Sequence, residues 1–119
     1  MNYREIEEFK STLMQILKKG CRVKIDTYGI DGKIIGVGFK PYWTNPADSK
    51  IDKVEFDILC DNGKIMPFYL QNVIGSHIKA QDGKDLGRSR NLCLEIYTYS
   101  LSRASDSEPY DKLSLLIYK

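Results

Sequence analysis

The chain has only one histidine, His77, and no cysteine or carboxylate stands at the spacing from it that a metal site or a catalytic triad requires. General acid–base catalysis by histidine depends on a positioned partner. Asp82 and Asp85 follow His77, but they fall in a polar stretch typical of a loop. We therefore predict that the protein is not an enzyme and that it uses no metal and no cofactor.

Cysteine is also scarce. The chain has three, Cys21, Cys60 and Cys93, an odd number of residues that lie far apart in the sequence. Such a set does not form the disulfide framework of a small secreted domain. Cys21 and Cys60 fall on the inward phase of predicted strands, where a thiol is buried and unreactive. The cysteines therefore indicate a reduced, cytoplasmic protein.

Long apolar runs are missing as well. Residues 1–10 are charged from Arg4 onward, and nowhere do about 18 apolar residues follow one another, as a membrane-spanning helix needs. The sequence accordingly predicts a soluble protein without a membrane partner. The formal net charge is only +2, whereas proteins that bind duplex nucleic acid usually have a strongly basic face.

Acidic residues gather at Glu55, Asp57 and Asp61, a group that would suit a cation in principle. Glu55 and Asp57 alternate as outward residues of a predicted strand, and Lys53 and Lys64 lie near them in the sequence. A solvated charged face explains this pattern, so we predict no metal site there.

The composition, 42% hydrophobic and 29% charged over 119 residues, fits one globular domain over 1–119. Its predicted class is α+β, with an N-terminal helix as the lid of a small five-stranded antiparallel β-barrel that a C-terminal β-hairpin extends. The predicted segments are the helix at 1–20, the small barrel at 21–78, a loop at 79–91 and the β-hairpin at 92–119.

The helix is expected over residues 3–19, because apolar residues recur there three or four positions apart. These residues are Ile6, Phe9, Leu13, Ile16 and Leu17. Asn2 stands at the N-cap position, and Lys18 and Lys19 precede Gly20 at the C-terminal end. The apolar stripe predicts that the helix covers an open end of the barrel.

Strands are predicted at 21–28, 33–39, 53–60 and 64–70, where apolar and polar residues alternate or turn residues mark the ends. The stretch Gly29-Ile30-Asp31-Gly32, with its Asp-Gly dipeptide, is expected to form the first hairpin turn, and 61–63 the second. The segment 40–52 is the longest barrel loop. Pro67 cannot donate a ladder hydrogen bond, so it predicts an edge or a bulge in its strand.

Beyond the polar loop at 79–91, two β-rich runs at 92–101 and 112–118 predict a hairpin with a long connection. Leu92, Leu94 and Ile96 share one face of the first run. Tyr97 and Tyr99 lie with Cys93 and Glu95 on the other face, which we expect to show its tyrosines to solvent.

The loop 40–52 carries the residues that most resemble a binding site. Trp43, the only tryptophan, stands beside Tyr42 between two prolines, and Lys40 and Asn45 flank them. Rigidly presented aromatic side chains dominate binding hot spots. Folding back of Trp43 over a barrel mouth is the alternative.

The order of a helix and five short strands, with Gly36 in the second and Val-Ile-Gly-Ser-His-Ile entering the fifth, resembles the Sm-like family of RNA-binding barrels over residues 3–78. An SH3-like or Tudor-like barrel fits the strand plan too. The Sm-like resemblance implies ring oligomers and single-stranded RNA stacked on loop side chains, here Asn45 and Tyr42. Ile74 stands where that family would place a cation.

We therefore predict a non-enzymatic binding module that docks on a partner protein through Lys40, Tyr42, Trp43, Asn45, Tyr97 and Tyr99. A phage or mobile-element inhibitor, or an accessory factor of a nucleic-acid-handling or defence complex, would suit this composition. The alternative is an Sm-like protein that binds single-stranded RNA or DNA, with Tyr42 and Trp43 as stacking platforms. Its phosphate contacts would be Arg22, Lys24, Lys40, Lys50, Arg88 and Arg90. Both hypotheses leave the oligomeric state open.

Overall fold

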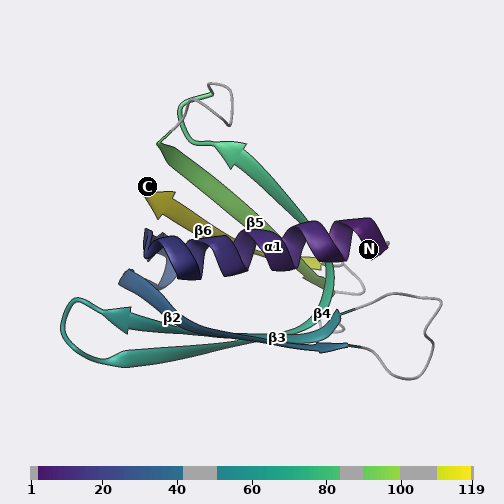
Figure 1. The fold of residues 1–119 in the computed structure, drawn as a ribbon, viewed down its shortest axis with the longest axis horizontal. Helices are drawn as coiled ribbons and strands as arrows, with labels where there is room; N and C mark the ends of the chain where they lie inside the picture. Colours follow the sequence, from purple (N-terminus) through teal and green to yellow (C-terminus); the bar gives the residue numbers. More distant parts are fainter. Residues whose placement is uncertain (1–2, 42–50, 84–89, 100–109, 119) are drawn as a thin grey trace.

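The computed structural model describes residues 3–41, 51–83, 90–99 and 110–118, which form one helix and six strands (Figure 1). Within these ranges the helix is too short and too polar to cross a membrane. The elements, in chain order, are α1 (Tyr3–Lys19), β1 (Arg22–Ile25), the 3-10 turn η1 (Asp26–Tyr28), β2 (Ile30–Pro41), β3 (Ile51–Cys60), β4 (Ile65–Ala80), β5 (Asn91–Tyr99) and β6 (Tyr110–Tyr118).

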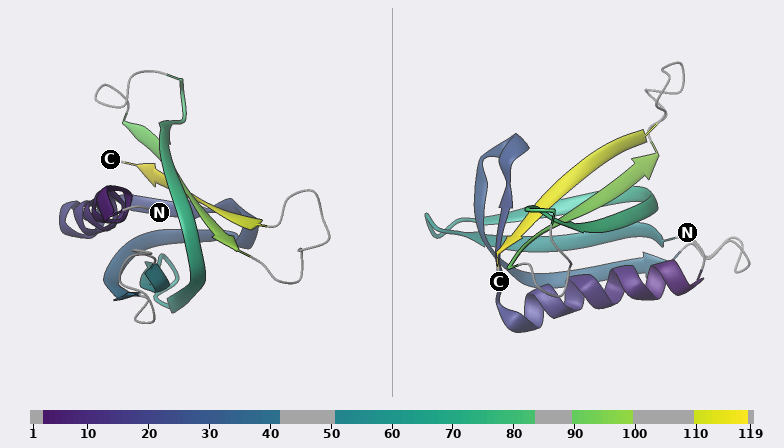
Figure 2. Two further views of the ribbon diagram at one scale, coloured as in Figure 1. Left: turned by 90° about the vertical axis from the view of Figure 1, so that its right-hand side faces the viewer. Right: turned by 90° about the horizontal axis from the view of Figure 1, so that it is seen from above.

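All six strands belong to one antiparallel sheet, in which each pairs with the next along the chain. The order returns to its start, since β1 pairs with β2 along one side and with β6 along the other (Figure 2). The five-stranded barrel predicted over 21–78 is not confirmed. The C-terminal hairpin does not extend a finished barrel, because β6 supplies the partner of β1.

β4 replaces two predicted strands with one long bent strand. Its first half pairs with β3 up to Val73, and its second half pairs with β5 from Val73 to Ala80. A register shift between Val73 and Gly75 marks the point where the strand changes partner. Among the described residues, 65–72 of β4 therefore pair on one side only, which is the edge that Pro67 predicts.

The helix and the strands share one hydrophobic core. The predicted helical stripe is confirmed at Phe9, Leu13 and Ile16, which are buried with residues of every strand. The ring of Phe9 meets that of Phe39 on β2 edge to face, with 6.3 Å between centroids. In two views α1 lies alongside β2 (Figures 1 and 2). The helix is thus part of the core.

The first hairpin turn differs from the prediction. β1 ends at Ile25, and η1 with Gly29 makes the turn, Gly29 having a positive φ of 63°. Asp31 and Gly32 lie inside β2 instead. A side chain at Gly32 would collide with β3, because its Cβ would lie 2.1 Å from the carbonyl oxygen of Leu59. Close strand contact, not turn geometry, therefore requires this glycine.

The other predicted turns need smaller corrections. The second hairpin turn at 61–63 is confirmed, since the N–H of Gly63 donates to the carbonyl of Cys60 at 2.9 Å. The loop predicted at 79–91 is shorter at both ends, because β4 continues to Ala80 and β5 begins at Asn91. The backbone N–H of Gln81 donates to Asn91 across this connection at 2.9 Å.

Candidate functional site

Most of the predicted binding residues fall outside the described part of the chain. This holds for the whole of Tyr42, Trp43, Asn45, Lys50 and Arg88, and for the side chains of Lys40 and Tyr99. The partner-binding hypothesis for the loop 40–52 therefore stays a prediction. Arg90 has an exposed side chain and remains available for the nucleic-acid alternative.

Two of the predicted phosphate contacts have partners within the protein. The guanidinium of Arg22 pairs with Asp31, with 2.9 Å between Nε and Oδ1, and also with Asp61 on the β3–β4 turn. Lys24 lies 3.7 Å from Asp31 and over the ring of Tyr118. These ion pairs connect β1 to the beginning of β2 and to the β3–β4 turn. A phosphate would have to compete with the carboxylates for the two cations.

The face of β5 predicted to be open to solvent is covered at Cys93 and Glu95, and Tyr97 on the same face is half-buried. Cys93 and Glu95 are both 6% exposed. The carboxylate of Glu95 lies 2.7 Å from Nζ of Lys79 on β4, and it accepts a 2.5 Å hydrogen bond from the hydroxyl of Tyr97. Tyr97 thus holds a buried carboxylate in place, and burial raises the pKa of the Cys93 thiol.

Hydrogen bonds from Lys79 and Tyr97 lower the pKa of Glu95 from 4.5 to about 2. The pKa of Glu95 is lower in the folded protein than in the unfolded chain. The ionised carboxylate therefore stabilises the folded protein above pH 4.5, and this stabilisation is lost as the pH falls toward 2. We expect urea unfolding at a series of pH values to show this loss, and Glu95→Gln to flatten it. Asp57→Asn, which replaces an outward carboxylate of β3 by its amide, is the matched control.

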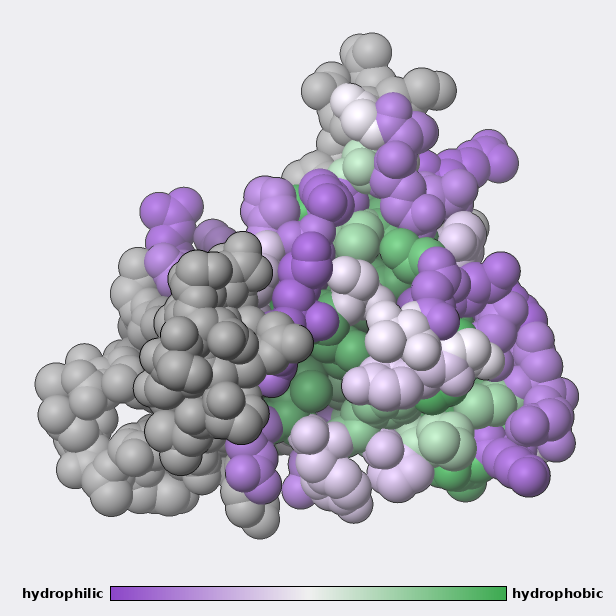
Figure 3. Space-filling model, turned by 180° about the vertical axis from the view of Figure 1, so that it is seen from behind, coloured by the Kyte–Doolittle hydropathy of each residue, from purple (hydrophilic) through white to green (hydrophobic). Residues whose placement is uncertain are grey.

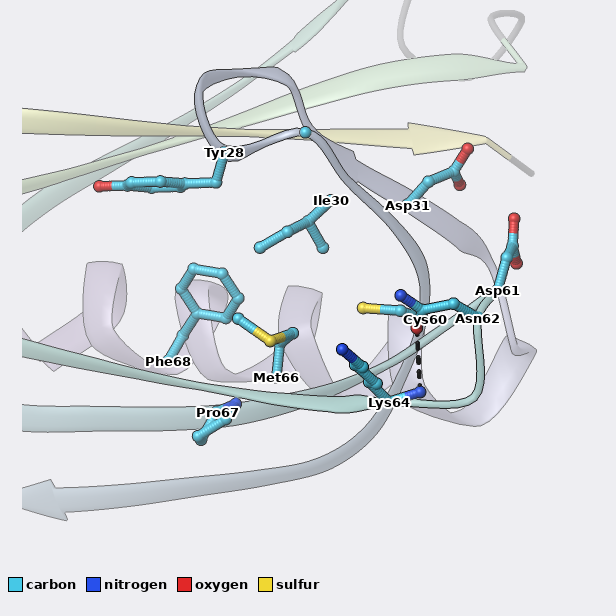
Figure 4. A pocket seen from close by; sticks show the side chains of 11 residues that line it. Tyr28, Ile30, Asp31, Cys60, Asp61, Asn62, Lys64, Met66, Pro67 and Phe68 are labelled. Atoms are coloured by element: carbon cyan, nitrogen blue, oxygen red, sulfur yellow. Dashed lines mark hydrogen bonds between the residues drawn. The ribbon is translucent and has the colours of Figure 1, made fainter.

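A groove that the sequence analysis missed lies between η1 and the beginning of β4 (Figure 4). It has a volume of about 670 Å³, within the range of sites that bind ligands. Met66 and Phe68 project into it from β4, and Tyr28 and Ile30 face them from η1 and β2, whereas Pro67 points to the opposite side. We call this space the hairpin groove.

Aromatic rings form one wall of the hairpin groove. Phe68 stacks on the buried Phe56 with 5.2 Å between ring centroids and 13° between planes. The ring of Tyr28 lies 6.1 Å from that of Phe68 and is 64% exposed. The groove therefore opens directly onto the edge of the core.

The opposite face of the same hairpin is apolar as well. Leu59 and Ile65 are paired across β3 and β4, and both are exposed. Ile35 on β2 and Tyr69 on β4 are also exposed, the latter to 66%. Seen from behind, apolar and weakly polar side chains gather at the surface in the lower part of the molecule beside a hydrophilic rim (Figure 3).

Two carboxylates and one lysine are the charged side chains that line the hairpin groove. Asp31 and Asp61 are held in ion pairs, while Lys64 makes no ion pair with a described residue. In the described ranges no three His, Cys, Asp or Glu side chains are close enough to hold a metal ion. One clue was present in the sequence: Ile65-Met66-Pro67-Phe68-Tyr69-Leu70 is apolar on both phases, as in a strand covered on both faces.

Comparisons with protein families, with curated proteins and with solved structures found no match for this chain.

Proposed function

We propose that the protein is a non-enzymatic module that binds an extended segment of a partner protein at the hairpin groove. One observation carries the proposal. The run 65–70 has the apolar residues of a strand covered on both faces, yet Met66 on the groove side and Ile65 and Tyr69 on the opposite face are all exposed. A partner that packs against this hairpin would cover the exposed apolar surface.

The charge on the hairpin favours a protein over a nucleic acid. Glu55 and Asp57 on the outer face of β3, and Asp61 on the turn, present carboxylates that would repel phosphates. The single-stranded nucleic-acid alternative rests on cations elsewhere, of which Arg22 and Lys24 are already paired with carboxylates. The hairpin groove therefore supports the binding of a partner protein and not the binding of a nucleic acid.

The test compares three variants in the capture of partner proteins from a lysate of the native host. Tyr28→Ser removes an exposed ring of the groove, and we expect it to weaken capture by about 2 kcal/mol or more, as for a hot-spot residue. Its free energy of unfolding should change by less than about 1 kcal/mol, because Tyr28 is mostly exposed. Ile74→Ser, which alters an exposed apolar residue at the β4 bend, is the matched control and should capture normally.

The third variant, Tyr42→Ala with Trp43→Ala, separates the groove from the loop 40–52. If the groove is the docking site, this variant captures the same proteins as the wild type. Undiminished capture by Tyr28→Ser together with lost capture by the loop variant would contradict the proposal and return the site to Tyr42 and Trp43. A thermal melt of each variant shows whether lost capture follows from lost folding.

A further inference from the structure

We propose that the hairpin groove takes the C-terminal end of the partner chain, added as a strand antiparallel to β4, with its terminal carboxylate at Lys64. This inference rests on the proposed function and names the kind of segment bound. Three features carry it: the edge of β4 that no described strand pairs with, the apolar wall of the groove and the charge at the end of the hairpin.

The hydrogen-bond pattern of the hairpin shows which groups of β4 face its free edge. The N–H of Cys60 donates to the carbonyl of Lys64 at 2.8 Å, so these two form a hydrogen-bonded pair. Bonded and non-bonded pairs alternate in antiparallel strands, and the register therefore turns the backbone groups of Ile65, Pro67 and Tyr69 away from β3. Proline lacks an N–H, so this edge has one carbonyl more than it has donors.

An extended backbone is the ligand that satisfies such a row of alternating groups. Its donors would reach the carbonyls of Ile65, Pro67 and Tyr69, and its carbonyls would accept from the N–H groups of Ile65 and Tyr69. The described residues offer no other strand to this part of β4, since β5 pairs with it only from Val73 onward. A small molecule without a peptide backbone would leave these groups unpaired.

Alternate side chains of an added strand would enter the groove. Met66 and Phe68 point to the groove side of β4, and Tyr28 faces them from η1 (Figure 4). Side chains that lie between these residues contact carbon and sulfur atoms, so apolar residues fit there best. The bound segment should thus be apolar at every second position.

The direction of the segment follows from the charges. Lys64 immediately precedes β4 and lines the groove on the same side as Met66. The nearby carboxylates of Asp31 and Asp61 are paired with Arg22, which leaves the ammonium of Lys64 as the charge without a described ion-pair partner. A strand antiparallel to β4 ends beside Lys64, where a terminal carboxylate would form a charge-assisted hydrogen bond.

The probes for this inference are two peptide arrays of the same random decapeptides, one with free C-terminal carboxylates and one with C-terminal amides. We expect binding to the free acids with an apolar last residue, and affinity about tenfold weaker for the matching amides, as for a lost charge-assisted hydrogen bond. Lys64→Gln should remove this difference. Lys33→Gln, which removes an exposed lysine on β2, is the matched control and should keep the difference in affinity between the acids and the amides.

Backbone N-methylation of the best peptide provides a second readout. Each backbone nitrogen is methylated singly. Methylation should abolish binding at alternate positions, because only alternate N–H groups face β4. The remaining positions should tolerate it. Equal effects at all positions would overturn the strand-addition geometry.

The outcomes separate this inference from the proposed function. Equal binding of acids and amides, or no binder in either array, overturns the inference; if Tyr28→Ser still abolishes capture of host proteins, the groove remains a docking site. Undiminished capture by Tyr28→Ser contradicts both proposals. A dimer seen by sedimentation that Tyr28→Ser dissolves would make a second copy of this chain the occupant, and it too would overturn the inference.

Discussion

Replacing Gly32 by alanine is expected to abolish cooperative folding. The new Cβ would lie 2.1 Å from the carbonyl oxygen of Leu59, 2.8 Å from its carbonyl carbon and 2.9 Å from Cα of Cys60. All three are backbone atoms of β3, so relief requires β2 and β3 to separate where they are paired. We expect a loss beyond the usual overpacking cost of about 1–3 kcal/mol, measured by urea unfolding or seen as a missing thermal transition.

The matched control for this prediction is Gly36→Ala in the same strand. The Cβ added there would meet only a side-chain oxygen of Asp57, at 3.7 Å. This is an ordinary contact with an atom that can move, so we expect a change of less than about 1 kcal/mol. Similar unfolding curves for the two variants would contradict the close approach of β2 and β3.

Replacing Leu13 by alanine is expected to destabilise the protein by about 2–5 kcal/mol, the range for removing a large aliphatic side chain from a core. Leu13 is 0% exposed and lies in the same core cluster as buried residues of the strands. Since small domains have stabilities of about 5–15 kcal/mol, this change removes a large part of the total. Chemical denaturation at constant temperature measures it directly.

Gln15→Ala controls for the effect of substitution in the helix itself. Gln15 is exposed on the same helix, and its replacement should change the free energy of unfolding by less than about 0.5 kcal/mol. An unchanged midpoint for Leu13→Ala would mean that α1 does not belong to the core. The helix would then be a candidate for partner binding.

Surface variants separate a loss of binding from a loss of folding. Gly32 and Leu13 hold together the part of the fold from which the β3–β4 hairpin projects, so their variants would lose binding through lost folding. Tyr28 in η1 and Lys64 beside the turn of that hairpin are both exposed. Their variants therefore test binding while the core stays intact.

Local patterns in the sequence were enough to predict the helix and most of the strand positions. The spacing of Phe9, Leu13 and Ile16 defines one face of a helix, and the structure buries that face. The alternation of Val54, Phe56 and Ile58 defines the inner face of β3 in the same way. Both patterns depend on side-chain direction within a single element, which the backbone period determines.

The number of strands and the closure of the sheet required the tertiary structure. β4 reads as two short strands because Asn72 and Gly75 interrupt its apolar pattern, whereas the structure bends it as one strand between two partners. The pairing of β1 with β6 joins residues near the two ends of the described chain. A local pattern carries no information about such a partner.

The candidate site depended on the tertiary structure for the same reason. The sequence by itself directed attention to Tyr42 and Trp43, because adjacent aromatic residues between two prolines are recognisable without knowing the fold. The hairpin groove needs Tyr28 and Phe68, which are forty positions apart in the sequence and meet only in the folded sheet. What the sequence determined was that Pro67 places an edge or a bulge in this strand; which side of the strand has no neighbour among the described residues was decided by strand pairing, since an edge exists only where no neighbour reaches it.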